Sequence, residues 1–269
     1  MGTRIGIVAG SGAFPSKAIA AALSQGYSCV VAGIRGEAQP EIERISSDFA
    51  WVEATRPSDL VAFFRRLDVR EIVFVGKVDP RILVRGDRLD DVAARLLAGV
   101  SDRTPPSILA VLFAYFESQG LTVRDPGFLL SPYFCPEGVL TAAAPSGRVA
   151  DDIAFGWAVA KAAADLEVGQ TVIVKNRAIV AVEGLEGTDE TIKRAGRLAG
   201  DGTVAVKVAR TRQDLRVDVP AVGLETLRSL AEAKAAALCF EALRVAFFDK
   251  AEALELAGAA GIAVLARKG

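Results

Sequence analysis

The sequence predicts an α/β protein in which an N-terminal Rossmann-like doubly wound domain is followed by a second, dissimilar α/β domain. Short apolar runs alternate with longer amphipathic ones, as they do in parallel sheets with crossover helices. A turn-rich stretch at 125–138, with three prolines and two glycines, separates two such series. A chain of 269 residues, 51% of them hydrophobic, can bury a core in each half. We therefore expect one domain at 1–132 and another at 133–269.

In the first domain, apolar runs predict four strands, and amphipathic runs predict the helices. Pro15 can begin the helix after the first strand, because its missing N–H would have no partner in a first turn. Ser58 is placed to cap the next helix. The expected strands are 4–9, 28–34, 49–52 and 71–75, and the expected helices are 16–25, 58–67, 89–98 and 107–119.

The second domain restarts the alternation beyond the turn-rich stretch. Its last part runs helix, strand, helix, strand, which is typical of a second α/β unit. The expected helices are 151–165, 189–198, 224–235 and 250–259, and the expected strands are 171–175, 178–183, 203–208, 237–240 and 261–265.

Residue types exclude several classes of function. Lysine plus arginine number 32 against 33 acids, so there is no basic excess of the kind that binds nucleic acid. The sequence has no histidine, which excludes Ser-His-Asp and Cys-His nucleophiles, histidine metal ligands and imidazole bases. The chemistry must therefore use carboxylates, lysine, arginine, hydroxyls, backbone N–H groups or a hard cation held by carboxylates.

Neither the cysteines nor the N-terminus indicates export. Cys29, Cys135 and Cys239 are an odd number without a close pair, which favours a reducing compartment. Residues 1–9 run directly into a glycine turn and lack the apolar core and cleavage site of a secretory signal. No apolar run reaches the roughly 20 residues that a spanning helix needs. We expect a cytoplasmic protein that touches a membrane at most.

The turn Gly10-Ser11-Gly12 is the first candidate ligand site. Glycines between a strand and a helix let the backbone approach a phosphate, and N–H groups at a helix start favour negative charge. A dinucleotide site would need a third glycine where Pro15 stands and an acid where Arg35 stands, so NAD is disfavoured. A phosphate or nucleotide cradle and a plain tight turn remain open.

Lys77 is the second candidate, in the turn 76–80 that follows the fourth expected strand. Ligands of open α/β sheets usually lie at the carboxyl ends of the strands. At such a place Lys77 would neutralise a phosphate oxygen. The alternative is a solvated lysine, since most lysines in loops are exposed.

An acidic bend between a strand and a helix is the third candidate. Glu183, Glu186 and Asp189 are spaced three residues apart, and a folded-back loop could gather their oxygens around one hard divalent ion. The alternative is local, because Thr188 or Asp189 can cap the helix that starts there. Capping does not account for Glu183, since an acid at the end of an apolar strand costs free energy unless it is paired or bound to a metal.

A run of charges at 207–218 is the fourth candidate. It holds a lysine, three arginines and two acids within twelve residues, among them Lys207, Arg216 and Asp218. Cations in a loop can clamp a diphosphate while a carboxylate holds a metal or a water. A cluster of surface ion pairs is the alternative.

Taken together, these stretches resemble the family of UDP-2,3-diacylglucosamine pyrophosphatases found in many Gram-negative bacteria that lack the more widespread metallophosphoesterase for that step. The resemblance runs nearly from end to end. Its specific motifs are Glu-x-x-Glu-Gly-Thr-Asp at 183–189 and Arg-x-Asp-x-Pro at 216–220, in this order and at this separation. Further matching blocks lie at 5–15, 75–78 and 168–174.

The resemblance implies a magnesium-dependent hydrolase of lipid A synthesis. It would release UMP and 2,3-diacylglucosamine 1-phosphate, with water attacking the α phosphorus. The family's essential carboxylate carries over onto Asp218, and Gly187 and Thr188 carry over as site members without an individual role. The resemblance also implies a homodimer and two dissimilar domains with substrate bound between them. One departure is Ser-Asp-Arg-Thr-Pro-Pro at 101–106, where the family usually shows a glycine and two acids.

The resemblance and the residue types together suggest a mechanism. Hydrolysis of a diphosphate needs charge stabilisation, an oriented water and a leaving group that departs as an anion. We expect Asp218, helped by Glu183 or Asp189, to position one Mg²⁺ and its water. Cations would neutralise the diphosphate, with Lys77, Lys207 and Arg216 as the candidates. The partner is then a lipid-linked UDP-sugar, with transient contact at the inner-membrane surface and no nucleic acid.

Two other functions remain open. The protein could bind a UDP-linked lipid and present it to a partner enzyme without cutting it, and release of UMP distinguishes this from hydrolysis. A nucleotide-dependent oxidoreductase is a further alternative. The missing third glycine and ribose-binding acid argue against it, and titration with NADH would decide.

Overall fold

A computed structural model describes residues 3–78, 89–101, 104–145 and 147–269. The chain forms two compact units: Met1–Pro132 with Asp214–Asp218, and Tyr133–Gln213 with Val219–Gly269. We expected 133–269 to form the second domain without interruption. The five residues Asp214–Asp218 are the correction to that range, and apolar packing explains them, because Val217 packs against the aromatic core of the first unit.

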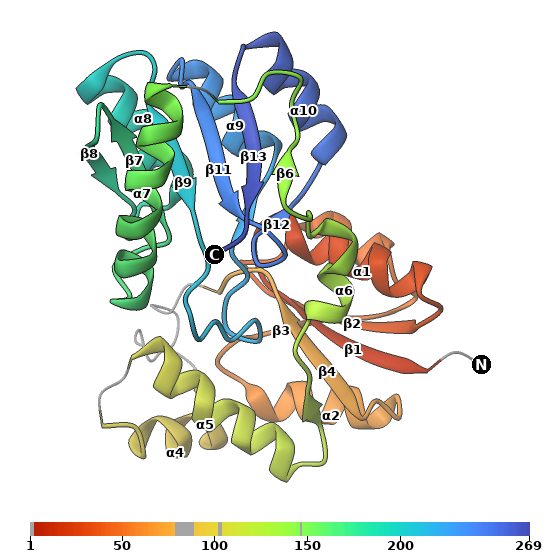
Figure 1. The fold of residues 1–269 in the computed structure, drawn as a ribbon. Helices are drawn as coiled ribbons and strands as arrows, with labels where there is room; N and C mark the ends of the chain where they lie inside the picture. The colour runs from red at the N-terminus through yellow and green to blue at the C-terminus, as the bar shows by residue number, and fades with distance from the viewer. Residues whose placement is uncertain (1–2, 79–88, 102–103, 146) are drawn as a thin grey trace. The chain divides into compact units, whose positions relative to one another are not determined.

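The first unit is built on a five-stranded parallel sheet in the order β3-β2-β1-β4-β5 (Figure 1). This is the strand order of Rossmann-like domains, in which ligands bind where the order reverses, here between β1 and β4. The predicted fold class is confirmed. The strands are β1 Arg4–Ala9, β2 Ser28–Ile34, β3 Asp48–Val52, β4 Glu71–Val75 and β5 Thr122–Val123.

Helices pack on this sheet through apolar residues at helical spacing. Phe64 of α2 and Phe116 of α5 are buried against β1, β2 and β4, and the Phe74 ring of β4 lies 5.7 Å from that of Phe116. The helices are α1 Phe14–Ser24, α2 Pro57–Arg66, α4 Asp91–Ala98, α5 Pro105–Ser118 and α6 Gly127–Leu130, with 3-10 helices η1 Pro40–Arg44 and η2 Ser131–Tyr133.

The second unit has a mixed six-stranded sheet in the order β6-β13-β11-β9-β7-β8 and a parallel pair, β10 with β12. Strands β9, β11 and β13 are parallel to one another, whereas β7 runs antiparallel to β9 and to β8. The strands are β6 Gly138–Val139, β7 Thr171–Lys175, β8 Ala178–Val182, β9 Val204–Lys207, β10 Ala221–Val222, β11 Ala237–Glu241, β12 Ala246–Phe247 and β13 Ala263–Arg267.

Helices cover both faces of this second sheet, so that it forms the middle of three layers (Figure 1). Trp157 and other residues of α7 pack on one face, and Ile192, Leu227 and Leu230 of α8 and α9 help to bury the other, together with α10. The expected second, dissimilar α/β domain is therefore confirmed. The helices are α7 Arg148–Asp165, α8 Thr188–Ala199, α9 Leu224–Glu232 and α10 Lys250–Ala259.

Some local expectations were wrong. Ser58 does not cap α2, which begins at Pro57 without a side-chain cap. Instead its hydroxyl donates to Asp90 Oδ2 at 2.6 Å, and Asp90 caps α4 by accepting from the Ala93 N–H at 2.6 Å. The turn-rich stretch 125–138 also holds α6, η2 and the first residue of β6. Among the described helices, none has the length and apolar character to cross a bilayer.

A buried carboxylate fixes the turn between β7 and β8. Asp152 of α7 is 1% exposed and accepts from the N–H groups of Asn176 at 2.9 Å and Arg177 at 2.5 Å. Both turn residues have a positive φ, 53° and 58°, which non-glycine residues rarely adopt. Because β7 runs antiparallel to β9, this turn lies at the opposite edge of the sheet from the end of β9.

Candidate functional site

Polar residues gather at one edge of the second sheet. Lys207 ends β9 and Glu241 ends β11, so both lie at the carboxyl ends of parallel strands. Thr171 begins the antiparallel β7 directly opposite Lys207, and Glu183 follows β8 at the same edge. Lys207, Glu241 and Thr171 are 5%, 4% and 0% exposed. Buried polar groups at such an edge are the expected form of a ligand site in an α/β sheet.

The Lys207 ammonium is the centre of this group. It donates to Thr188 Oγ1 at 2.7 Å and to Thr171 Oγ1 at 3.1 Å, and it lies 3.5 Å from Glu183 Oε2. Thr188 Oγ1 in turn donates to Glu183 Oε1 at 2.7 Å, and the Gln170 N–H donates to Oε2 at 3.3 Å. The acid at the end of the apolar strand is thus paired with a lysine, one of the two outcomes that its position required.

The ionisation of Glu183 follows from these contacts. Burial alone would raise its pKa, but the Lys207 ammonium and hydrogen bonds from Thr171, Thr188 and Gln170 outweigh burial and hold the pKa below its usual range. Glu183 is therefore a carboxylate at neutral pH. It holds the Lys207 ammonium beside the Thr171 and Thr188 hydroxyls. These groups could bind a phosphate in place of their present partners.

The expected helix caps in the acidic bend were wrong. Gly187, with a φ of 83°, is the N-cap of α8, and no side chain caps the helix, because the Thr188 hydroxyl is used by Glu183. Glu186 does not gather with the other two acids either, since its Oε1 accepts from Thr191 and Arg194.

The pKa of Asp189 is shifted in the opposite direction to that of Glu183. Its Oδ1 is buried and accepts no hydrogen bond. Burial raises the pKa of this carboxyl, the Lys207 ammonium only partly opposes the rise, and Glu225 adds to it. Two carboxyls near one ammonium thus have pKa values moved in opposite directions, a pattern found at catalytic sites.

The donor set bears on magnesium, which the resemblance implies. A magnesium ion that binds together with a phosphate substrate needs only one or two carboxylates from the protein. Asp189 Oδ1 fits this need, whereas Glu183 is already held by Lys207 and Thr188. Within the described ranges, no three Asp, Glu or Cys side chains gather as metal ligands. Of the acids around Lys207, Asp189 is therefore the one that fits a magnesium ion.

Asp218 and Arg216 lie in the segment that groups with the first unit. The side chain of Asp218 is half-buried, and its N–H donates to the Asp214 carbonyl at 3.2 Å. The Arg216 guanidinium donates to both carboxylate oxygens of Asp214, at 2.7 and 3.0 Å, and lies 5.5 Å from the centre of the Phe113 ring. Arg216 would have to exchange this partner to bind a diphosphate.

The glycine turn and Lys77 lie together in the first unit. An antiparallel bridge joins them: the Ser11 N–H donates to the Lys77 carbonyl at 2.7 Å, and the Lys77 N–H donates to the Ser11 carbonyl at 3.1 Å. The Gly10 N–H is bound by the Val75 carbonyl. A phosphate would therefore depend on later N–H groups at the start of α1. The turn borders a hollow lined by Gly10, Gly12, Pro15, Ser16, Gln39, Glu41, Ile42 and Ile45.

The predicted site residues thus fall into three places. Thr188, Asp189, Glu183 and Lys207 lie together in the second unit, next to Gly187. Gly10, Ser11, Gly12 and Lys77 lie together in the first unit, where the Lys77 side chain is exposed. Arg216 and Asp218 lie in Asp214–Asp218. Residues 79–80 of the turn after β4 and 102–103 of the departure at 101–106 lie outside the described ranges.

We expect Gly10→Ala to destabilise the first unit. A Cβ at Gly10 would lie 2.3 Å from the Lys77 carbonyl oxygen, and because that atom is backbone, the bridge must shift. The free energy of unfolding should fall by about 1–3 kcal/mol. Urea denaturation measures this. Gly99→Ala is the control, since a Cβ there meets only the carbonyl oxygens of Leu96 at 3.5 Å and Arg95 at 4.0 Å, both ordinary contacts. Equal stability of the two variants would contradict the prediction.

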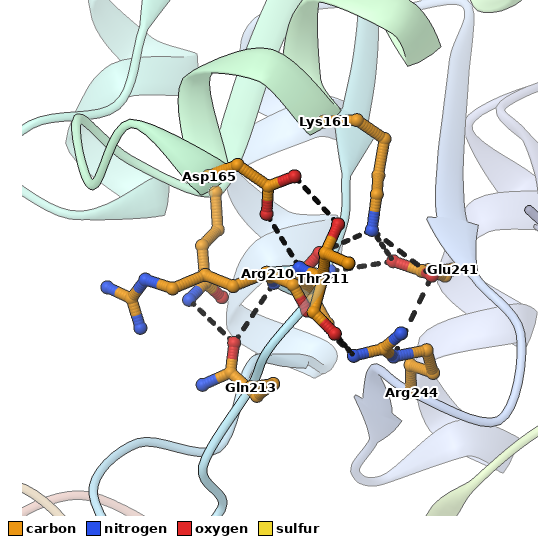
Figure 2. A network of polar contacts seen from close by, with 9 residues as sticks. Lys161, Asp165, Arg210, Thr211, Gln213, Glu241 and Arg244 are labelled. Carbon is orange, nitrogen blue, oxygen red and sulfur yellow. Dashed lines mark hydrogen bonds and ion pairs between the residues drawn. The ribbon is translucent and has the colours of Figure 1, made fainter.

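Sequence reasoning missed a polar network that surrounds the chain just after β9 (Figure 2). Its centre is Glu241, the last residue of the apolar strand β11. Glu183 has a similar place, directly after the apolar strand β8. The signal that singled out Glu183 was therefore present here too. The partners could not be found in this way, because they come from separate elements. They are Lys161 and Asp165 of α7, the loop residues Arg210, Thr211 and Gln213, and Arg244.

Comparison with known proteins agrees with these observations. The family models described as the LpxI N-terminal domain and the LpxI C-terminal domain match residues 4–132 and 136–265. The UDP-2,3-diacylglucosamine pyrophosphatase LpxI of Caulobacter vibrioides is 25% identical over 273 residues, which cover 97% of this chain and 96% of the relative.

A solved structure, glycinamide-RNase-transformylase T from Mycobacterium tuberculosis, is similar at a TM-score of 0.24 and 16% identity. The match covers 67% of this chain but only 44% of that one. The two family models, by contrast, follow each other along the chain and leave only the termini and residues 133–135 unmatched. The chain therefore belongs to the LpxI family.

Proposed function

We propose that the protein hydrolyses the diphosphate of UDP-2,3-diacylglucosamine to UMP and 2,3-diacylglucosamine 1-phosphate in lipid A biosynthesis. The relative of that name, similar over 97% of this chain, supports the substrate and the reaction. The observation on the molecule that carries the proposal is the buried Lys207 ammonium beside the Thr171 and Thr188 hydroxyls. A cation and two hydroxyls at a carboxyl edge suit an anionic group.

The residues of the chain can supply the needs of this reaction without histidine. Lys207 would neutralise non-bridging oxygens of the diphosphate, and Glu183 keeps that ammonium in place. The Thr188 hydroxyl now donates to Glu183 and would donate to a phosphate oxygen instead. Asp218 would orient the attacking water. The leaving group needs no acid, because a sugar phosphate departs as a stable anion.

Magnesium is part of the proposal, with Asp189 as the residue of the second unit that would hold it. When bound, the ion would add positive charge at the phosphate oxygens. The raised pKa of Asp189 and its unbonded Oδ1 support this choice over Glu183, because a cation would satisfy that oxygen and favour its charged form.

We expect the purified protein to release UMP from UDP-2,3-diacylglucosamine, to lose this activity in EDTA and to regain it when excess Mg²⁺ is added. In water labelled with ¹⁸O, mass spectrometry should find the label in UMP, because attack occurs at the α phosphorus. Label in the sugar phosphate would contradict the mechanism. Tight binding of the substrate without release of UMP would favour a presenting protein instead, and full activity in EDTA would remove magnesium from the proposal.

The same proposal includes a homodimer in the cytoplasm that makes transient contact with the inner-membrane surface, where a substrate with two acyl chains resides. The resemblance to the family supports these points. Light scattering checks the dimer, and sedimentation with phospholipid vesicles checks the contact.

A further inference from the structure

Two charged side chains clamp the peptide groups of Ala209, two residues after Lys207. The Ala209 N–H donates to Glu241 Oε2 at 2.9 Å, and its carbonyl accepts from Lys161 Nζ at 2.7 Å. Lys161 and Glu241 also form an ion pair with each other at 3.2 Å, and Arg244 Nε lies 3.8 Å from Glu241 Oε1. Figure 2 shows Lys161 and Glu241 pointing toward the chain at Arg210 and Thr211, the residues that follow Ala209.

The next two residues are held in the same way. The Arg210 N–H donates to Gln213 Oε1 at 3.1 Å, and the Thr211 N–H donates to Asp165 Oδ1 at 2.6 Å. The Arg244 guanidinium donates to the carbonyls of Arg210 at 2.7 Å and Thr211 at 3.2 Å (Figure 2). Six successive backbone polar groups, from the Ala209 N–H to the Thr211 carbonyl, are thus bound by side chains.

The need to pair buried backbone groups accounts for only part of this arrangement. Ala209 is 0% exposed, so its N–H and carbonyl need partners, but Arg210 is half-buried and Thr211 is exposed, and their backbone groups could bind water at little cost. Glu241 is 4% exposed, and burying an ion pair such as Lys161 with Glu241 rarely stabilises a protein more than apolar residues of the same size would. Loops held rigid by surrounding side chains are, however, what a reaction requires when its groups must keep fixed positions.

The held residues, Ala209 to Thr211, lie in the sequence between two candidate catalytic residues, Lys207 and Asp218. Lys207 lies two residues before Ala209, and Gln213, which binds the Arg210 N–H, is followed directly by Asp214, the first residue of the segment that carries Asp218. Gln213 Oε1 also accepts from Gln170 Nε2 at 3.2 Å, and the Gln170 N–H binds Glu183. The hydrogen bonds that hold residues 209–211 are therefore continuous with those around Lys207.

We propose that Lys161 and Glu241 are positioning residues for hydrolysis of the diphosphate: by clamping Ala209 they fix the chain that follows Lys207. This inference rests on the proposed function. Neither residue needs to touch the substrate, and their effect comes through the backbone that they hold.

The test compares Glu241→Ala and Glu241→Gln with Asp152→Ala. For Glu241→Ala we expect kcat per folded molecule to fall about 10- to 100-fold, because small displacements of reacting groups cost that much. KM should stay near the wild-type value. Glu241→Gln keeps an acceptor for the Ala209 N–H and should recover part of the rate. Hydrogen exchange in a peptide covering 208–213 should become faster in Glu241→Ala and not in Asp152→Ala.

Asp152 is the matched control because it, like Glu241, is a buried carboxylate of the second unit that accepts from backbone N–H groups, but it lies at the opposite sheet edge. Asp152→Ala should lower the melting temperature and leave kcat per folded molecule unchanged. If Glu241→Ala does not fold, Arg244→Gln replaces it. That side chain is 38% exposed, and its loss frees the carbonyls of Arg210 and Thr211.

Wild-type kcat in the variant that folds would overturn the inference, and so would an equal loss of kcat in Asp152→Ala, because the effect would then be one of general stability. These results differ from failure of the proposed function itself. If the wild-type protein releases no UMP, the proposed function falls and this inference falls with it. If the wild-type protein turns over and the variants match it, only the inference is overturned.

Discussion

Asp218→Asn is expected to reduce the rate of UMP release by about 10²- to 10³-fold or more, the loss typical of removing one group that acts in the transition state. Asparagine has nearly the same shape as aspartate but lacks the charge that would hold a cation or orient a water. Initial rates with UDP-2,3-diacylglucosamine, measured beside a thermal unfolding curve, test this expectation.

The variant should fold normally, which makes its rate informative. Asp218 is half-buried, and its backbone N–H donates a hydrogen bond to the Asp214 carbonyl. This bond survives the substitution, because it involves no side chain. Val217, packed on the core of the first unit, also keeps the segment in place. Asp201→Asn is the control: this exposed acid pairs only loosely with Lys234, at 3.6 Å, and its loss should change nothing. Turnover by Asp218→Asn at the wild-type rate would remove Asp218 from the mechanism.

The strands could be predicted where they are buried on both faces. The ranges Ser28–Ile34 and Glu71–Val75 agree with the prediction to the residue, because an apolar run bounded by polar residues marks such a strand. Strands of two residues, such as Thr122–Val123 and Ala246–Phe247, were missed, since they are too short to leave a periodic pattern. Their existence depends on pairing with a neighbouring strand.

The candidate site could be predicted only in part. An acid at the end of an apolar strand had to be paired or bound to a metal, which singled out Glu183. The sequence could not choose between the two outcomes, because Lys207 becomes a neighbour only through the register of β7 between β8 and β9. The same register brings Thr188 beside Glu183. The Thr188 hydroxyl therefore donates to the Glu183 carboxylate and does not cap the helix.

Lys207→Met is expected to affect both activity and stability. Without the ammonium, kcat/KM for the diphosphate substrate should fall by about 10²-fold. Glu183, whose side chain is 13% exposed, would remain buried without its counter-charge, and breaking such a pair lowers the free energy of unfolding by about 3–5 kcal/mol. Urea denaturation at neutral pH measures the second effect, and Glu183→Gln in the same variant should restore stability without restoring activity.

The pH dependence of stability separates this pairing from a packing effect. In the wild-type protein the pKa of Glu183 is lower when folded than when unfolded, so its contribution to stability is present above the unfolded value, about 4.3, and is lost as the pH falls through the folded value. In Lys207→Met, burial should dominate and raise the folded pKa above the unfolded one. The difference in stability between the two proteins should then be largest at neutral pH and shrink as acid protonates Glu183. A difference that stays constant across this range would mean that Lys207 contributes only through packing.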